Sequence, residues 1–183
     1  MFKQTKLDNG LTIVGELRPE AHSVAIGFLV KTGARDETLE VSGVSHFLEH
    51  MMFKGTEKRS ALDITYNLAE IGAQANAYTS EENTVYYASI LPEYFSDCFD
   101  ILSDMLRPSL DQKEFDVEKK VILEEIALYQ DRPTHILFEK TMQEFFKGHT
   151  AGNSVLGTID SITALSSEQM KESFDRRYSP SNI

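Results

Sequence analysis

The sequence predicts an α+β domain of two layers, in which helices pack against a mainly antiparallel β-sheet. Two pairs of short apolar segments are each joined by a turn signal, which is typical of β-hairpins. Strand and helix patterns are also mixed along the chain instead of alternating strictly, which argues against a parallel sheet. A length of 183 residues suits one domain, and we expect residues 1–183 to form it.

Five segments have the apolar patterns of strands: residues 2–7, 11–17, 23–32, 74–79 and 84–91. An Asp-Asn-Gly turn joins the first two into a hairpin. The third is apolar enough to predict a strand in the centre of the sheet. The last two form a second hairpin around a polar turn.

Six segments predict helices, and each opens on a residue type that starts or caps a helix. They cover residues 42–54, 60–71, 92–107, 111–130, 133–146 and 166–177. Ser42, Ser60 and Ser166 are the predicted N-caps, because a serine hydroxyl accepts a hydrogen bond from the first helical turn. Pro92 and Pro133 suit a first helical turn, where the missing N–H is not needed.

Composition excludes several classes of function. The formal net charge of −11 argues against nucleic acid as a partner. No apolar run approaches the roughly 18 residues of a membrane span, so we expect no membrane partner. The N-terminus also lacks the apolar stretch of a signal peptide, which predicts a cytoplasmic location. Cys98 is the single cysteine, so any metal must be held by nitrogen and oxygen.

The most informative pattern is His-x-x-Glu-His at His46, Glu49 and His50. On a helix, positions four apart point the same way one turn from each other, so both imidazoles can share one metal ion. Glu49 projects to the other side of His46, where its carboxylate can reach a water on that metal. This arrangement is typical of a metallohydrolase.

The residues around the motif are apolar nearly all round the predicted helix, which indicates that it is buried. Two histidines and a carboxylate there must be paired or coordinated, since leaving them unsatisfied costs several kcal/mol. A buried hydrogen-bond network is the simpler alternative for two histidines alone. The glutamate at the right offset favours the metal.

A hydrolytic zinc site needs a third protein ligand, and the predicted helix 111–130 offers two. Glu118 and Glu125 are seven residues apart and share an apolar stripe, whereas Glu124 lies on the solvent side. One of the two should bind the metal and the other a histidine, but spacing does not decide which. Alternatively, a lysine or arginine from another helix pairs with these glutamates. The remaining histidines are interpreted as surface or capping residues: His22, His135 and His149.

Three blocks together match a known family: residues 46–50 (His-Phe-Leu-Glu-His), 76–80 (Asn-Ala-Tyr-Thr-Ser) and 118–125 (Glu-Lys-Lys-Val-Ile-Leu-Glu-Glu). They resemble the inverted-motif zinc peptidases of the pitrilysin, insulin-degrading enzyme and mitochondrial processing peptidase family. The similarity covers essentially the whole chain. Within the family, the chain closely resembles the bacterial processing-peptidase-like members. Blocks in this order are far more specific than the histidine motif alone.

The resemblance implies one Zn²⁺ held by His46, His50 and Glu125. It implies that Glu49 is the general base and that Glu118 orients a ligand without binding the metal. The implied activity is that of a zinc-dependent endopeptidase acting on extended peptides or presequence-like segments.

The resemblance also implies that Asn76 and Ala77 belong to a strand that pairs with the peptide substrate. Family members close two similar halves into a chamber, so we expect a second homologous domain or subunit as a partner. This chain matches the first half and stops before its last strand, and we expect it to bind zinc but to cleave peptides poorly alone. A non-enzymatic scaffold and a peptide-holding regulatory module are the alternatives.

Overall fold

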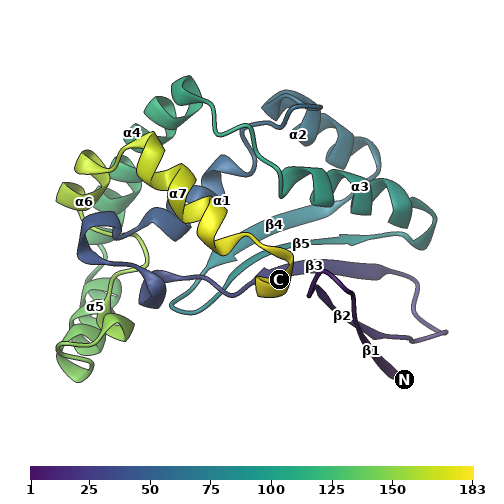
Figure 1. Cartoon of the computed structure of the whole chain (residues 1–183), viewed down its shortest axis with the longest axis horizontal. Helices are drawn as coiled ribbons and strands as arrows, with labels where there is room; N and C mark the ends of the chain where they lie inside the picture. Colours follow the sequence, from purple (N-terminus) through teal and green to yellow (C-terminus); the bar gives the residue numbers. More distant parts are fainter.

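The computed structural model describes residues 1–183 and confirms the α+β prediction. Its five strands are β1 (Phe2–Lys6), β2 (Thr12–Glu16), β3 (Val24–Val30), β4 (Gln74–Thr79) and β5 (Thr84–Ile90). Its seven α-helices are α1 (Val44–Met51), α2 (Ala61–Glu70), α3 (Phe95–Met105), α4 (Gln112–Gln130), α5 (Pro133–Phe145), α6 (Ile159–Ala164) and α7 (Ser167–Arg177). Helices α2 and α3 lie along the sheet, whereas α4 to α7 gather at one end of it (Figure 1).

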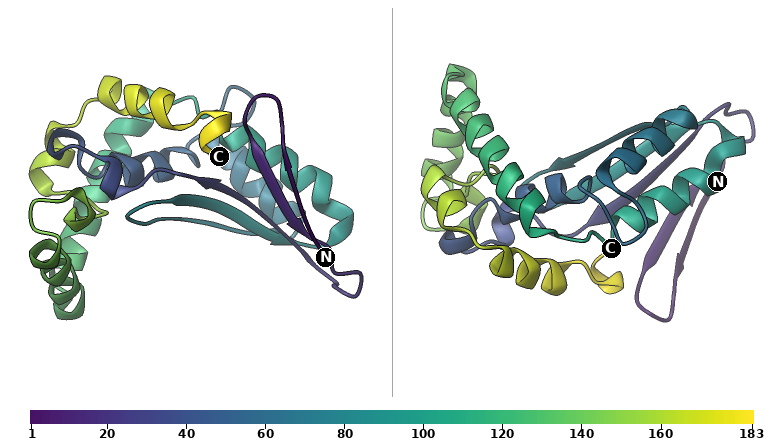
Figure 2. Two further views of the ribbon diagram at one scale, coloured as in Figure 1. Left: turned by 60° about the horizontal axis from the view of Figure 1, so that its bottom comes forward. Right: turned by 90° about the horizontal axis from the view of Figure 1, so that it is seen from above.

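The main sheet is antiparallel and has the strand order β3-β5-β4, while β1 and β2 form a separate hairpin. The prediction that residues 23–32 form a central strand is therefore wrong, because β5 pairs with both neighbours and leaves β3 at an edge. Alternate residues of β5 face the helices, so Tyr86 and Ala88 are buried while Tyr87 is exposed. The side views in Figure 2 show the hairpin standing apart from the helical end of the molecule.

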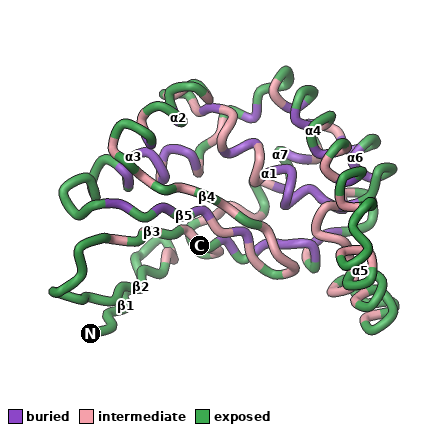
Figure 3. Tube along the Cα trace, turned by 180° about the vertical axis from the view of Figure 1, so that it is seen from behind, coloured by how far each residue is buried: buried purple, intermediate pink, exposed green.

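Two larger clusters of buried apolar side chains hold the helices in place. One joins α2 and α3 to the sheet through residues such as Ile64, Ala88 and Leu102. The other joins α1 to α4, α6 and α7, and in it the rings of Phe47 and Phe115 stack with centroids 4.7 Å apart. Figure 3 shows buried backbone running through α1, as predicted from its apolar surroundings, whereas α5 and the β1-β2 hairpin are mostly exposed.

Helix α1 starts differently from the prediction. Its N-cap is Gly43 rather than Ser42, and no side chain at the cap bonds to the first turn. Instead, the buried carboxylate of Glu37 accepts hydrogen bonds from the backbone N–H groups of Gly43 at 2.6 Å and Ser45 at 2.7 Å. A side chain at position 43 is excluded, since a Cβ there would lie 2.6 Å from the carbonyl oxygen of Leu156 and φ is +90°.

Other helix boundaries agree more closely with the sequence. Ser60 and Ser166 cap α2 and α7 with full capping boxes, and the Asp111 carboxylate caps α4. The predicted helix 92–107 is divided, because a 3₁₀ turn at Pro92–Tyr94 precedes α3. Helix α6 was not predicted, and α1 ends at Met51, before the predicted stop at Lys54. Not one of the helices combines the length and the apolar character needed to cross a membrane.

Candidate metal centre

Helix α1 places two imidazoles side by side at its contact with α4. His46 and His50 are one helical turn apart, and their ring centroids are separated by 4.7 Å. His46 is buried and His50 is half-buried. Because α1 contacts α4, α7 and β4, the helix is fixed on several sides, and both rings are held at the interface with α4.

Helix α4 brings a carboxylate to the same point. Glu125 Oε2 lies 3.7 Å from His46 Nε2 and 3.6 Å from His50 Nε2. These separations are too long for hydrogen bonds. They are close to the spacing of two ligands on one tetrahedral zinc, which is roughly 3.3–3.6 Å for bonds of 2.0–2.2 Å. One donor atom from each of the three residues lies within 4.8 Å of the others, so the group could hold a metal ion.

Glu118 lies on the far side of His50 and is almost fully buried, with 3% of its surface exposed. Its Oε2 is 3.0 Å from His50 Nδ1, and its Oε1 is 2.5 Å from Lys54 Nζ. An ionised carboxylate can only accept, so Nδ1 carries the proton and Nε2 keeps its lone pair toward Glu125. Spacing alone left the two glutamates equivalent, but in the structure Glu125 faces Nε2 of both histidines and Glu118 faces only His50 Nδ1. Glu118 also has a lysine partner, Lys54.

Burial controls the charge of His46. Desolvation, followed by the charge of His50, lowers the His46 pKa to about 3, so the imidazole is neutral at neutral pH. A neutral imidazole is the form that binds metal. The buried Nδ1 has no hydrogen-bond partner within the protein, so nothing in the chain competes for the ring.

Glu49 follows the two histidines on α1 and is half-buried beside them. Burial raises its pKa, a hydrogen bond from Thr79 and the charge of His50 oppose that shift, and the nearby Glu125 charge adds to it. The Thr79 hydroxyl donates to Glu49 Oε2 at 2.7 Å. A carboxylate with a raised pKa, next to a group that could hold a metal ion, is suited to accepting and returning a proton.

Asn76 and Ala77 lie on β4, the strand at the edge of the sheet nearest this cluster. Their partners in β5 are Tyr87 and Tyr86, so one side of β4 is paired and the other has no strand beside it. The other three histidines lie outside the cluster, and His22 and His149 are exposed.

The sequence analysis missed several residues that contact this site. Lys54 reaches Glu118, and Thr79 reaches Glu49. The hydroxyls of Tyr86 and Tyr178 lie 2.7 Å apart, although 92 positions separate them in the chain. Burial raises the pKa of both tyrosines, and the charge of Glu49 adds to that shift. Lys54 stands one helical turn after His50, and that spacing could have indicated it. The threonine and tyrosine contacts depend on how the sheet packs on α1, and no local pattern indicates them.

The sequence profile of the insulinase family, peptidase family M16, matches residues 12–159. The chain belongs to this family. Over its whole length this M16 chain is 39% identical to YmxG of Bacillus subtilis, an uncharacterised zinc protease. Over 99% of its length it is 41% identical to SCO5738 of Streptomyces coelicolor, another uncharacterised zinc protease.

Solved structures have the same fold. The fold matches a protease from Helicobacter pylori with a TM-score of 0.95 at 24% identity, covering 100% of this chain and 44% of that one. It matches an M16-like peptidase from Alicyclobacillus acidocaldarius with a TM-score of 0.90 at 28% identity, with the same coverage. The chain spans 45% of YmxG and 40% of SCO5738, which is less than half of each.

One similar structure bears on location. The periplasmic protease PqqL from Escherichia coli is 26% identical, with a TM-score of 0.88 over 99% of this chain and 21% of that one. Since the family fold also occurs in the periplasm, the cytoplasmic location stays a prediction.

Proposed function

We propose that this M16 chain is the zinc-binding catalytic part of a metalloendopeptidase that hydrolyses extended peptides or presequence-like segments. One observation carries the proposal: donor atoms of His46, His50 and Glu125 converge within 4.8 Å beside the carboxylate of Glu49. The names of the relatives, which are zinc proteases, support it.

Two imidazoles and one carboxylate suit zinc, and hydrolytic zinc sites keep a fourth position open for water. The proposed ligands are His46 Nε2, His50 Nε2 and Glu125 Oε2, whose spacing fits one ion. When bound, zinc lowers the pKa of a coordinated water to about 7 and polarises the substrate carbonyl. Glu118 orients His50 by accepting its Nδ1 proton.

Glu49 is the proposed general base. Its carboxylate takes a proton from the attacking water and later passes that proton to the leaving amine. The bond from Thr79 occupies Oε2, which leaves Oε1 to receive the proton. Burial raises the pKa of Glu49, which increases its proton affinity in the direction that such a role needs.

The unpaired side of β4 is the proposed binding edge for the peptide. An extended substrate that adds to this edge makes main-chain hydrogen bonds near Asn76 and Ala77. Such pairing recognises any extended backbone and leaves the choice of side chains to neighbouring pockets. This supports peptides as the substrate class.

A second homologous domain or subunit is the proposed partner that closes the site. The chain covers 44% of the Helicobacter pylori protease, 44% of the M16-like peptidase and less than half of its curated relatives, which leaves room for such a half in them. Without that half, we expect residues 1–183 to bind zinc and to cleave peptides poorly.

The test combines metal analysis with hydrolysis of a quenched fluorescent peptide by the full protein. We expect Glu49→Gln to keep one zinc and to lose hydrolysis, and His50→Ala to lose both. Normal turnover by Glu49→Gln would refute the role of Glu49. A wild-type protein that binds zinc and peptide without cleaving would favour the peptide-holding module instead.

A further inference from the structure

The carboxylate of Glu49 is held by a residue from the sheet and not from its own helix. Thr79, the last residue of β4, donates its hydroxyl hydrogen to Glu49 Oε2 at 2.7 Å. This is the one hydrogen bond that the protein makes to that carboxylate. A glutamate side chain has three rotatable bonds, so this contact limits where the carboxylate can point.

The neighbouring hydroxyl does not compete for the same role. Thr84, which pairs with Thr79 across the β4–β5 ladder, is fully buried and donates to the carbonyl of Thr32 at 3.0 Å. The two threonine oxygens are 3.4 Å apart. Because each hydroxyl has a single hydrogen, the proton of Thr84 is used by Thr32, and the proton of Thr79 remains for Glu49.

The backbone around Thr79 makes its position well defined. The strand pairs with β5 along its length and contacts α1, which carries Glu49. Threonine is branched at Cβ, so few side-chain rotamers are available to the hydroxyl. A donor fixed in this way can select one orientation of a mobile acceptor.

We propose that Thr79 is a positioning residue, which orients Glu49 so that its free oxygen is aimed at the attacking water. The inference rests on the proposed function. It also assigns a second role to β4, because the strand that offers its edge to the substrate would position the base as well. The peptide backbone and the base are then held in register by one rigid element.

Three substitutions distinguish the effect of the Thr79 hydroxyl from effects of side-chain shape and of the neighbouring hydroxyl. Thr79→Val removes the hydroxyl and keeps the branched shape, and Thr79→Ser keeps the hydroxyl. Thr84→Val is the matched control, since it removes a hydroxyl 3.4 Å away that donates to Thr32 and not to Glu49. All are assayed in the full, zinc-loaded protein.

We expect Thr79→Val to lower kcat on the order of tenfold, with KM and zinc content nearly unchanged, because the substrate edge and the ligands are intact. Thr79→Ser should recover most of the loss, and Thr84→Val should keep kcat. Equal kcat values for the wild type and Thr79→Val would overturn the inference while leaving the proposed function standing. A wild type without hydrolysis would overturn both.

A second readout needs no activity. In the zinc-free chain, Thr79→Val and Glu49→Ala are combined and unfolded in urea. If the hydroxyl bonds to the carboxylate, Thr79→Val should shift the midpoint less in the Glu49→Ala background than in the wild type. Additive shifts would show that the two side chains do not interact, and would overturn the inference.

Discussion

Glu118 is a buried carboxylate that contacts both a lysine and one of the two clustered histidines. A carboxylate with 3% of its surface exposed needs cations or donors on both oxygens to stay ionised. Lys54 meets one oxygen and His50 Nδ1 the other. The lysine therefore stabilises the charge that selects the tautomer of His50.

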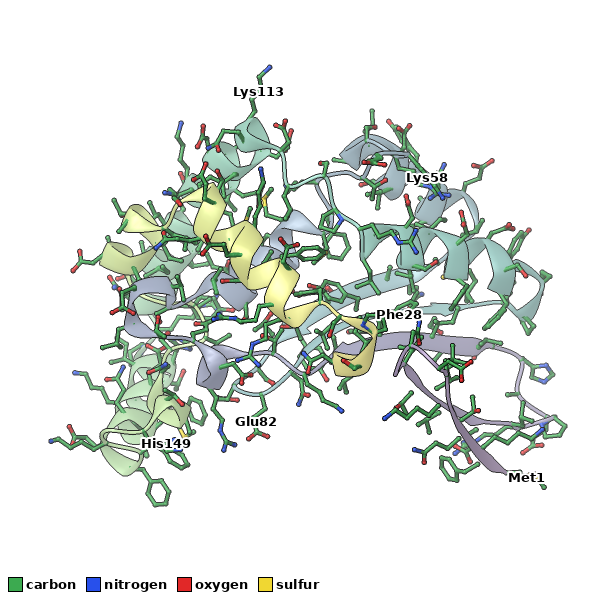
Figure 4. The ribbon with its side chains drawn as sticks, viewed as in Figure 1. Met1, Phe28, Lys58, Glu82, Lys113 and His149 are labelled. Atoms are coloured by element: carbon green, nitrogen blue, oxygen red, sulfur yellow. The ribbon has the colours of Figure 1, made fainter.

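Replacing Lys54 tests this arrangement. Lys54→Met should weaken zinc binding on the order of tenfold, because Glu118 loses the cation that keeps it an acceptor for His50. Lys113→Met is the control, since the Lys113 side chain points into solvent at the start of α4 (Figure 4). Affinity is measured by competition with a chelating dye. Equal zinc affinities for the wild type and Lys54→Met would show that Lys54 does not support zinc binding.

The buried imidazole of His46 predicts a pH effect on the metal-free chain. An unfolded histidine gains its proton near pH 6.5, whereas His46 in the folded chain does so at about 3. Between these values the unfolded state binds the extra proton, so folding stability falls as pH falls. The complete loss would amount to roughly 4–5 kcal/mol at 1.36 kcal/mol for each pKa unit.

Urea unfolding from pH 7.5 to pH 4 measures this dependence. His46→Leu should flatten the curve, and the same change at the exposed His22 should leave its slope intact. A slope that is identical in the wild type and in His46→Leu would show that burial does not control this imidazole.

At the scale of elements, α1 owes its start to a side chain outside the helix. Glu37 accepts from the first-turn N–H groups of Gly43 and Ser45. Glu37→Ala should lower the free energy of unfolding by about 2–3 kcal/mol, because both buried donors lose their acceptor. Glu40→Ala, at an exposed position nearby, should change it by less than about 0.5 kcal/mol. Urea denaturation compares the two, and equal effects would mean that the cap contributes nothing.

Whether a helix boundary or a strand position can be predicted depends on how far along the chain its hydrogen-bond partners lie. Ser60 and Ser166 cap their own helices within three residues, so a local pattern suffices. The cap of α1 comes from across a turn, and no local rule points to Glu37, so the prediction of Ser42 is wrong. The prediction of a central β3 is wrong because an apolar pattern indicates burial but not which strands pair.

At the scale of the whole molecule, some residues of the site can be predicted from local spacing, whereas others depend on contacts between segments far apart in the chain. His46, Glu49 and His50 lie on one helix, and their spacing alone predicts a common metal. Selecting Glu125 over Glu118 depends on how α4 lies against α1, and sequence reasoning reached it only through family resemblance. Thr79 meets Glu49 across 30 residues, which periodicity does not show. The spacing of Lys54 after His50 indicates that the lysine is near the site, but not that its partner is Glu118, 64 residues away.

Zinc at this position would add a link between two helices that already touch through apolar packing and through the His50–Glu118 hydrogen bond. His46 and His50 are on α1 and Glu125 is on α4, so the ion would cross-link the two helices. A ligand that binds only the folded state stabilises it, by about 4 kcal/mol at a thousand times its dissociation constant.

Zinc should therefore raise the thermal midpoint of the wild type by several degrees, and a chelator should reverse the shift. Glu49→Gln should respond as the wild type does, because this residue is not a proposed ligand. Glu125→Ala should respond weakly, since it leaves only the two imidazoles on α1 as proposed ligands and none on α4. Calorimetry with and without zinc measures all three. A zinc response in Glu125→Ala equal to that of the wild type would mean that the ion binds α1 alone or elsewhere. Packing and the His50–Glu118 hydrogen bond would then hold the two helices together without it.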